Sequence, residues 1–121
     1  MTDENKVNRA HKNVVGFMNW GKYVIAFDEG IYGDDRGAVE LEKILQKVLN
    51  PEKHDLFGGW DDMMGGFVKD NIRVDTFWTS LMDYFWTIDT DNEAVQKKVY
   101  KWACEVSDEC LKLQLNEIPP K

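Results

Sequence analysis

The chain has 121 residues, of which 43% are hydrophobic, and its 22 acidic and 15 basic side chains give a formal net charge of −7. This length predicts a single domain, 1–121, and the apolar content excludes a disordered chain. Phosphate backbones and anionic membrane surfaces repel a negative chain, so we expect no direct binding to nucleic acid or to a membrane. The charge is suited either to a protein partner with a basic surface or to solubility alone.

The two cysteines indicate a reducing compartment. Cys104 and Cys110 are six positions apart in a predicted helix, which separates them by about 9 Å along the axis. A disulfide needs Cα atoms within about 7 Å, so we predict two free thiols. The chain starts without the apolar segment of a secretory signal, and it contains no run of about 20 apolar residues that could span a bilayer. We therefore expect a cytoplasmic protein.

The first half of the chain predicts a strand pair followed by a helix. Residues 1–12 are polar and are expected to form a flexible arm. Residues 22–28 are short, β-branched and aromatic, which predicts a central strand, and a turn would let it pair with residues 14–18. Residues 36–50 carry apolar side chains at helical spacing, and the helix should end before Pro51.

The middle of the chain is less regular. Two glycine pairs interrupt residues 51–70, and this segment is expected to be a loop. Residues 71–88 allow two interpretations, because their apolar side chains recur at helical spacing but their β-branched and aromatic composition is typical of strands. We predict a hairpin with its turn near residues 80–83, and a helix is the alternative.

A long helix is expected near the end of the chain. Thr90 and Glu93 form the pattern of a capping box. Residues 92–114 then carry one apolar stripe that includes Trp102. Two prolines in residues 116–121 predict a frayed tail. Together the elements predict an α+β fold of two layers, in the order β-α-β-β-α, with an all-α fold as the alternative.

Motifs for metals, cofactors and nucleophiles are absent from the sequence. His11 and His54 lie in polar stretches, and neither has a second ligand at helical spacing. The segment from Asp89 resembles the start of a calcium loop, but Ala94 and Tyr100 stand where that loop needs Gly and Glu. No nucleophile elbow or phosphate-binding loop is present. We predict no metal site, no cofactor and no catalytic residue.

Carboxylates gather directly after the predicted central strand, at Asp28, Glu29, Asp34 and Asp35. Sites often form at strand ends, and paired carboxylates there can perform acid–base chemistry or bind magnesium. A solvated turn followed by a helix cap explains the same residues, and we favour it. An enzyme that uses the carboxylates of residues 28–35 is kept as an alternative function.

The segment between the glycine pairs has the composition of an interface. Trp60 and two methionines stand beside Asp61 and Asp62, and an apolar anchor ringed by charge is typical of a protein contact. In the alternative interpretation, Trp60 folds back onto the core. The predicted partner-binding residues are Asp28, Glu29, Asp34, Asp35, Trp60, Asp61 and Asp62.

In size, acidity, aromatic content and a hairpin-then-helix ending at residues 86–91 (WTIDTD), the chain is similar to small bacterial immunity proteins. The resemblance implies a protein that binds and inactivates one cognate toxin and performs no catalysis. We therefore expect a non-catalytic protein-binding domain, namely an immunity protein or antitoxin that neutralises a basic toxin. An adaptor or structural interaction protein without inhibitory activity is the alternative.

Overall fold

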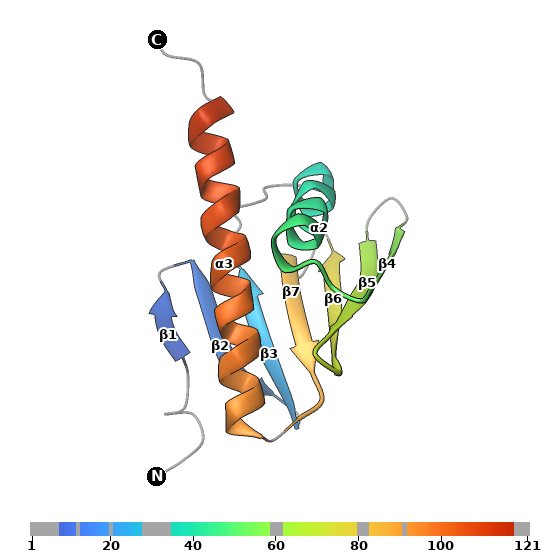
Figure 1. Ribbon diagram of the computed structural model, residues 1–121, viewed down its shortest axis with the longest axis vertical. Coiled ribbons are helices and arrows are strands. Elements are labelled where there is room, and N and C mark those ends of the chain that lie inside the picture. Colours follow the sequence, from blue (N-terminus) through green and yellow to red (C-terminus); the bar gives the residue numbers. More distant parts are fainter. Residues whose placement is uncertain are drawn as a thin grey trace.

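A computed structural model describes residues 8–11, 13–19, 21–27, 35–58, 62–79, 83–90 and 92–117. Its strands are β1 (Asn8–His11), β2 (Val14–Asn19), β3 (Lys22–Phe27), β4 (Lys53–Gly58), β5 (Asp62–Lys69), β6 (Ile72–Thr79) and β7 (Asp83–Ile88), and its helices are α2 (Asp35–Leu49) and α3 (Glu93–Glu117). The strands form one antiparallel sheet in the order β1-β2-β3-β7-β6-β5-β4. Both helices lie on the same face of this sheet (Figure 1).

The predicted fold class is confirmed at the level of an α+β domain with two layers, and the all-α alternative is wrong. The first hairpin is confirmed, because β2 and β3 pair from Val14↔Phe27 to Asn19↔Lys22. The second is confirmed as well, since β6 and β7 pair around Phe77↔Phe85. The predicted order β-α-β-β-α matches only roughly, because the structure has three strands before α2 rather than one, and four strands between the helices rather than two.

The prediction of a loop at residues 51–70 is wrong, because β4 and β5 occupy most of this segment. Its glycines are needed where neighbouring strands come unusually close. A Cβ atom on Gly65 would lie 2.1 Å from the carbonyl oxygen of Asp55, and one on Gly66 would lie 2.6 Å from that of Val74. Glycine pairs commonly mark turns, but Gly65 and Gly66 lie inside β5, where a side chain would collide with the neighbouring backbone.

The helix boundaries follow from local hydrogen bonds. Asn92 caps α3, because its Oδ1 accepts from the backbone nitrogens of Ala94 (2.9 Å) and Val95 (3.3 Å). The prediction that Thr90 caps this helix is therefore wrong, since the cap lies two residues later. The Thr90 hydroxyl instead accepts a hydrogen bond from the backbone nitrogen of Asn92 at 3.1 Å. Helix α2 ends as predicted before Pro51, and Asn50 follows it with a φ of 48°.

Regular secondary structure reaches closer to both termini than predicted. Four residues of the expected arm, 8–11, form β1, while residues 1–7 and 12 lie outside the described part. Helix α3 continues to Glu117, and residues 118–121 of the expected tail are also outside it. Within the described residues, no helix has both the length and the apolar character needed to cross a membrane.

The hydrophobic core lies between the helices and the face of the sheet that they cover. Trp86 is fully buried, and its ring centroid lies 5.0 Å from that of Phe27 and 5.2 Å from that of Phe67. Helix α3 contributes Val99 and Trp102, which the apolar stripe predicted as core residues. Large aromatic side chains thus lie at the centre of the core, surrounded by aliphatic side chains from both layers.

Replacing Trp102 should test this arrangement directly. Its side chain is only 6% exposed and packs 6.1 Å from Phe67, centroid to centroid. Trp102→Ala should lower the free energy of unfolding by about 3–5 kcal/mol, the usual cost of removing a large buried aromatic. Chemical denaturation measures the change, and Lys101→Ala at the exposed neighbouring position serves as the control. A loss within about 0.5 kcal/mol for Trp102→Ala would place this residue outside the core.

Both cysteines are free, as the sequence predicted, and Cys110 is buried. Burial raises the pKa of the Cys104 thiol to about 11 and that of Cys110 to about 12. Since the thiolate is the reactive form, the folded protein should react slowly with an alkylating agent at pH 8. Unfolding without reductant should expose two thiols that react rapidly, as measured by intact mass. A mass lower by two protons, with no alkylation, would instead reveal a disulfide.

Candidate functional site

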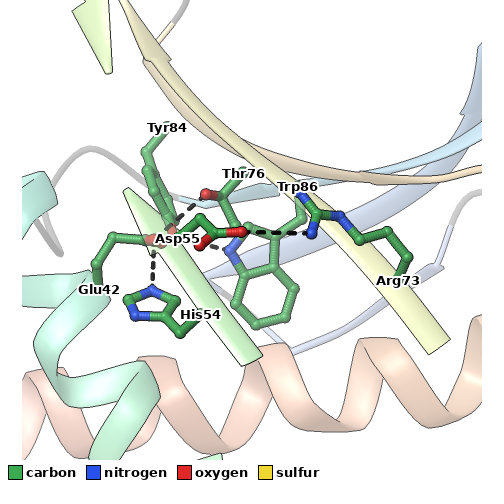
Figure 2. A network of polar contacts seen from close by, with 7 residues as sticks. All are labelled: Glu42, His54, Asp55, Arg73, Thr76, Tyr84 and Trp86. Carbon is green, nitrogen blue, oxygen red and sulfur yellow. Dashed lines mark hydrogen bonds and ion pairs between the residues drawn. The ribbon is translucent and has the colours of Figure 1, made fainter. Parts of the chain in front are cut away.

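A carboxylate is buried between α2 and the sheet. Glu42 is 0% exposed, and side chains from three strands donate to it (Figure 2). Tyr84 on β7 donates its hydroxyl to Oε2, and Thr76 on β6 donates to Oε1 at 3.3 Å. The ring nitrogen Nε2 of His54 on β4 lies 3.0 Å from Oε1. Removing a carboxylate from water costs several kcal/mol, and these three donors offset much of that cost.

The network continues into the aromatic core. Trp86 donates its indole N–H to the Tyr84 hydroxyl at 2.8 Å, so this hydroxyl accepts from one neighbour and donates to Glu42. Burial and the negative charge of Glu42 raise the pKa of Tyr84 well above its usual range, which keeps the hydroxyl protonated as a donor. The ring of Phe27 lies 5.2 Å from that of Tyr84 and helps to exclude water. This arrangement fixes the position of α2 over β6 and β7.

His54 connects the buried carboxylate to the surface of the molecule. Its side chain is 11% exposed, and its hydrogen bond to Glu42 is the largest effect that raises its pKa above the ordinary value of 6.5. The charges of Glu42 and Asp55 raise it further, and partial burial opposes them. His54 therefore holds the edge strand β4 to α2 most strongly when it is protonated.

The opposite face of the sheet carries a continuous apolar row. Alternation of side chains places Phe57, Met64, Phe77 and Phe85 on this face, and the strand register makes each the direct neighbour of the next. The rings of Phe77 and Phe85 stack with centroids 5.2 Å apart. No described element covers this face, since both helices lie on the other one. We call these four residues the outer patch.

Exposure within the outer patch rises toward the edge of the sheet. Phe77 and Phe85 are half-buried, whereas Met64 is 54% and Phe57 66% exposed. Beyond Phe85 the same row continues across β3 and β2 through Ala26 and Val15. Large side chains at this exposure gain free energy only when something covers them, so the row has the character of a contact surface.

Charged side chains border the outer patch. Arg73 lies over Gly66, which has no side chain to exclude it, and pairs with Asp75 at 3.0 Å and with Asp55 at 3.8 Å. Asp62 is exposed two residues before Met64 and therefore on the same face. An apolar centre with a charged rim is the composition expected of a protein interface.

The predicted binding residues are only partly described. Asp62 is exposed at the start of β5, and Asp35 is the first residue of α2. Asp28, Glu29, Asp34, Trp60 and Asp61 lie outside the described residues, so their part in a contact stays a prediction. The two methionines of the same segment separate, because alternation in β5 buries Met63 and exposes Met64.

Sequence reasoning missed both Glu42 and the outer patch. Glu42 lies four residues after Ala38 and three before Leu45, inside the apolar stripe of α2, and a carboxylate in that position indicates buried donors. His54 was read as an ordinary polar residue, since its partner is distant in sequence. Phe57 was assigned to a loop, so its place in a row across strands could not be recognised.

A separate cavity of about 300 Å³ opens between the ends of β6 and β7 and the start of α3. Asn71, Ile72, Arg73, Asp75, Ile88, Asp89, Thr90 and Val95 line it. None of the side chains that bond to Glu42 lines this cavity, so a molecule bound there would not contact that carboxylate. Among the described residues, no group of three or more His, Cys, Asp or Glu side chains could hold a metal ion.

Comparison with protein family models, with curated proteins and with solved structures finds no match to this chain. Its function must therefore be argued from the outer patch and the buried network themselves.

The contact between His54 and Glu42 predicts a pH-dependent stability. Because the pKa of His54 is raised above its unfolded value of 6.5, the added stability is fully present below that pH and is lost as pH rises through the folded-state pKa. His54→Asn should cost about 1–3 kcal/mol at pH 6, as expected for a charged hydrogen bond, and less at pH 9. Urea denaturation at both pH values measures this difference.

The control for this experiment is Lys43→Ala. Lys43 is exposed on the same helix and pairs with Glu40 rather than with the buried network. Its effect on the free energy of unfolding should be small and the same at both pH values. An equal loss at pH 6 and pH 9 for His54→Asn would contradict a stabilising charge on His54.

Proposed function

We propose that this chain is a non-catalytic protein-binding domain that contacts its partner through the outer patch. The observation that carries the proposal is the exposure of Phe57 and Met64 at the end of an apolar row on a face that no described element covers. Aromatic and methionine side chains are the residue types that most often anchor protein contacts. The buried network gives the sheet a fixed shape, so the patch is presented on a rigid support.

The proposed partner carries a basic contact surface. The net charge of −7 attracts such a protein at long range and raises its association rate. Near the patch, Asp55, Asp62 and Asp75 outnumber Arg73 and Lys53. A toxin neutralised by this chain, as in small immunity proteins, fits the charge and the size. An adaptor would use the same surface, and only the activity of the partner distinguishes the two.

The predicted carboxylate and tryptophan residues enter this proposal as additional contacts. Asp62 borders the outer patch on the exposed face, and Trp60 and Asp61 directly precede it in the chain. We propose that they extend the contact beyond the first residue of β5. Phe57 and Met64 replace Trp60 as its centre, because their exposure is a described feature of the structure.

A comparison of captured proteins tests the proposal. The wild-type chain and Phe57→Ser are used in parallel to isolate partners from the native host, with Gln46→Ala, at an exposed position of α2, as the control. A true partner should be retained by wild type and by Gln46→Ala and lost with Phe57→Ser. Circular dichroism and denaturation should first establish that all three proteins are folded to the same extent.

Binding kinetics with the captured partner measure how much Phe57 and Asp62 each contribute to the contact. Phe57→Ser should raise the dissociation rate by a factor of about 30 or more, since a central anchor contributes about 2 kcal/mol or more. Asp62→Asn should mainly lower the association rate and reduce its dependence on salt. Binding that is insensitive both to salt and to Phe57 would show that the contact lies elsewhere. Co-expression with the partner then shows whether the chain relieves its toxicity.

A further inference from the structure

Strand β4 ends the sheet with one edge open. It pairs with β5 in unbroken register from Lys53↔Val68 to Gly58↔Met63, and the strand order places no neighbour on its other side. Figure 1 shows no described element beyond this edge. The backbone groups along it are therefore available to a further strand.

The opposite edge of the sheet is different. Strand β1 has only four residues, and its register with β2 shifts between Asn8 and His11. Short strands and irregular registers are the means by which proteins protect sheet edges against pairing. Strand β4 has neither feature, so the two edges are unequal in their capacity to accept a strand.

Side chains along β4 suit an incoming strand rather than solvent. Leu56 is 37% exposed on the helix face, and Phe57 is 66% exposed on the outer face. Asp55 stands beside them, and its pairing with Arg73 at 3.8 Å is long enough to leave capacity for a second cation. The one lysine of this strand, Lys53, stands at its first position, so residues 55–58 carry no positive charge that would guard the edge.

We propose that the partner adds an extended strand to the open edge of β4, with a basic side chain opposite Asp55 and apolar side chains opposite Leu56 and Phe57. This inference rests on the proposed function and specifies how the partner binds. Backbone hydrogen bonds along β4 supply affinity in this mode, and the alternating side chains supply specificity. The added strand would extend the apolar row of the outer patch by one further position.

Charge selects a basic partner over a second copy of this chain. Two copies would each bring a net charge of −7 to the contact. Antiparallel pairing of the two β4 strands about Asp55 would also place the Asp55 carboxylates of the two copies opposite each other, which is destabilising. A strand with lysine or arginine opposite Asp55 meets neither penalty.

Synthetic peptides test the proposal without knowledge of the natural partner. The probe is the acetylated, amidated hexapeptide Thr-Val-Val-Lys-Thr-Thr, whose antiparallel pairing with β4 places its lysine opposite Asp55 and its two valines opposite Leu56 and Phe57. It is titrated into the isotope-labelled full chain and followed by the amide resonances. Its first control is the same peptide methylated at every backbone nitrogen, which keeps the side chains and loses the backbone donors. The second control replaces the lysine by glutamate.

The lysine peptide should shift the amide resonances of residues 53–58 and slow their hydrogen exchange, while those of β1 should stay unchanged. Backbone methylation should weaken binding at least about tenfold, because several hydrogen bonds of about 1 kcal/mol each are lost. Replacement of lysine by glutamate should weaken it further at low salt. The protein itself is unchanged in all three titrations, so loss of folding cannot imitate these results.

Three outcomes would overturn strand addition: no shifts in β4, equal binding of the methylated peptide, or shifts confined to β1. Protection, in the chain alone, of the β4 amides that do not bond to β5, together with a dimer in sedimentation, would assign this edge to a second copy and also overturn the proposal. If a partner is captured by the wild type and lost with Phe57→Ser, but the lysine peptide does not bind β4, the proposed function is supported and strand addition is wrong. Peptide binding at β4 without any captured partner would count against the proposed function alone.

Discussion

The burial of one carboxylate constrains the whole molecule. Glu42 has no contact with water, so its oxygens must find donors inside the protein. Those donors come from β4, β6 and β7, and each must be in its observed place before the helix can pack. The packing of α2 on the sheet therefore requires one register of three strands, whereas apolar packing alone would tolerate small shifts.

This constraint links the inside of the sheet to its proposed contact surface. His54 and Phe57 belong to the same six-residue strand, but alternation turns one toward Glu42 and the other toward the exposed face. The polar contact holds an edge strand whose one neighbour among the described strands is β5. An edge strand fixed in this way keeps its exposed apolar side chains in place for binding, without requiring a second strand to stabilise it.

The two faces of the sheet divide the roles of the aromatic residues. Trp86 and Tyr84 face the helices and build the core, while Phe85, between them in sequence, faces the uncovered side and joins the outer patch. Alternate positions of β7 thus serve the core and the outer patch. The Arg73 contacts over Gly66 add a charged border to this apolar row.

The sequence by itself determined the first strand pair, both helices and the free thiols, because these follow from side-chain composition, periodicity and spacing over a few residues. For residues 71–88 composition favoured a hairpin and periodicity a helix, so the tertiary structure decided the second hairpin and with it the α+β class. Only the tertiary structure decided that residues 51–70 form two strands, since Gly65 and Gly66 look like turn residues until neighbouring backbones are seen to approach them. It also decided the partners of Glu42, which lie 12 to 42 residues away. The outer patch is likewise a property of strand register across the sheet, and register is fixed by packing that no local pattern encodes.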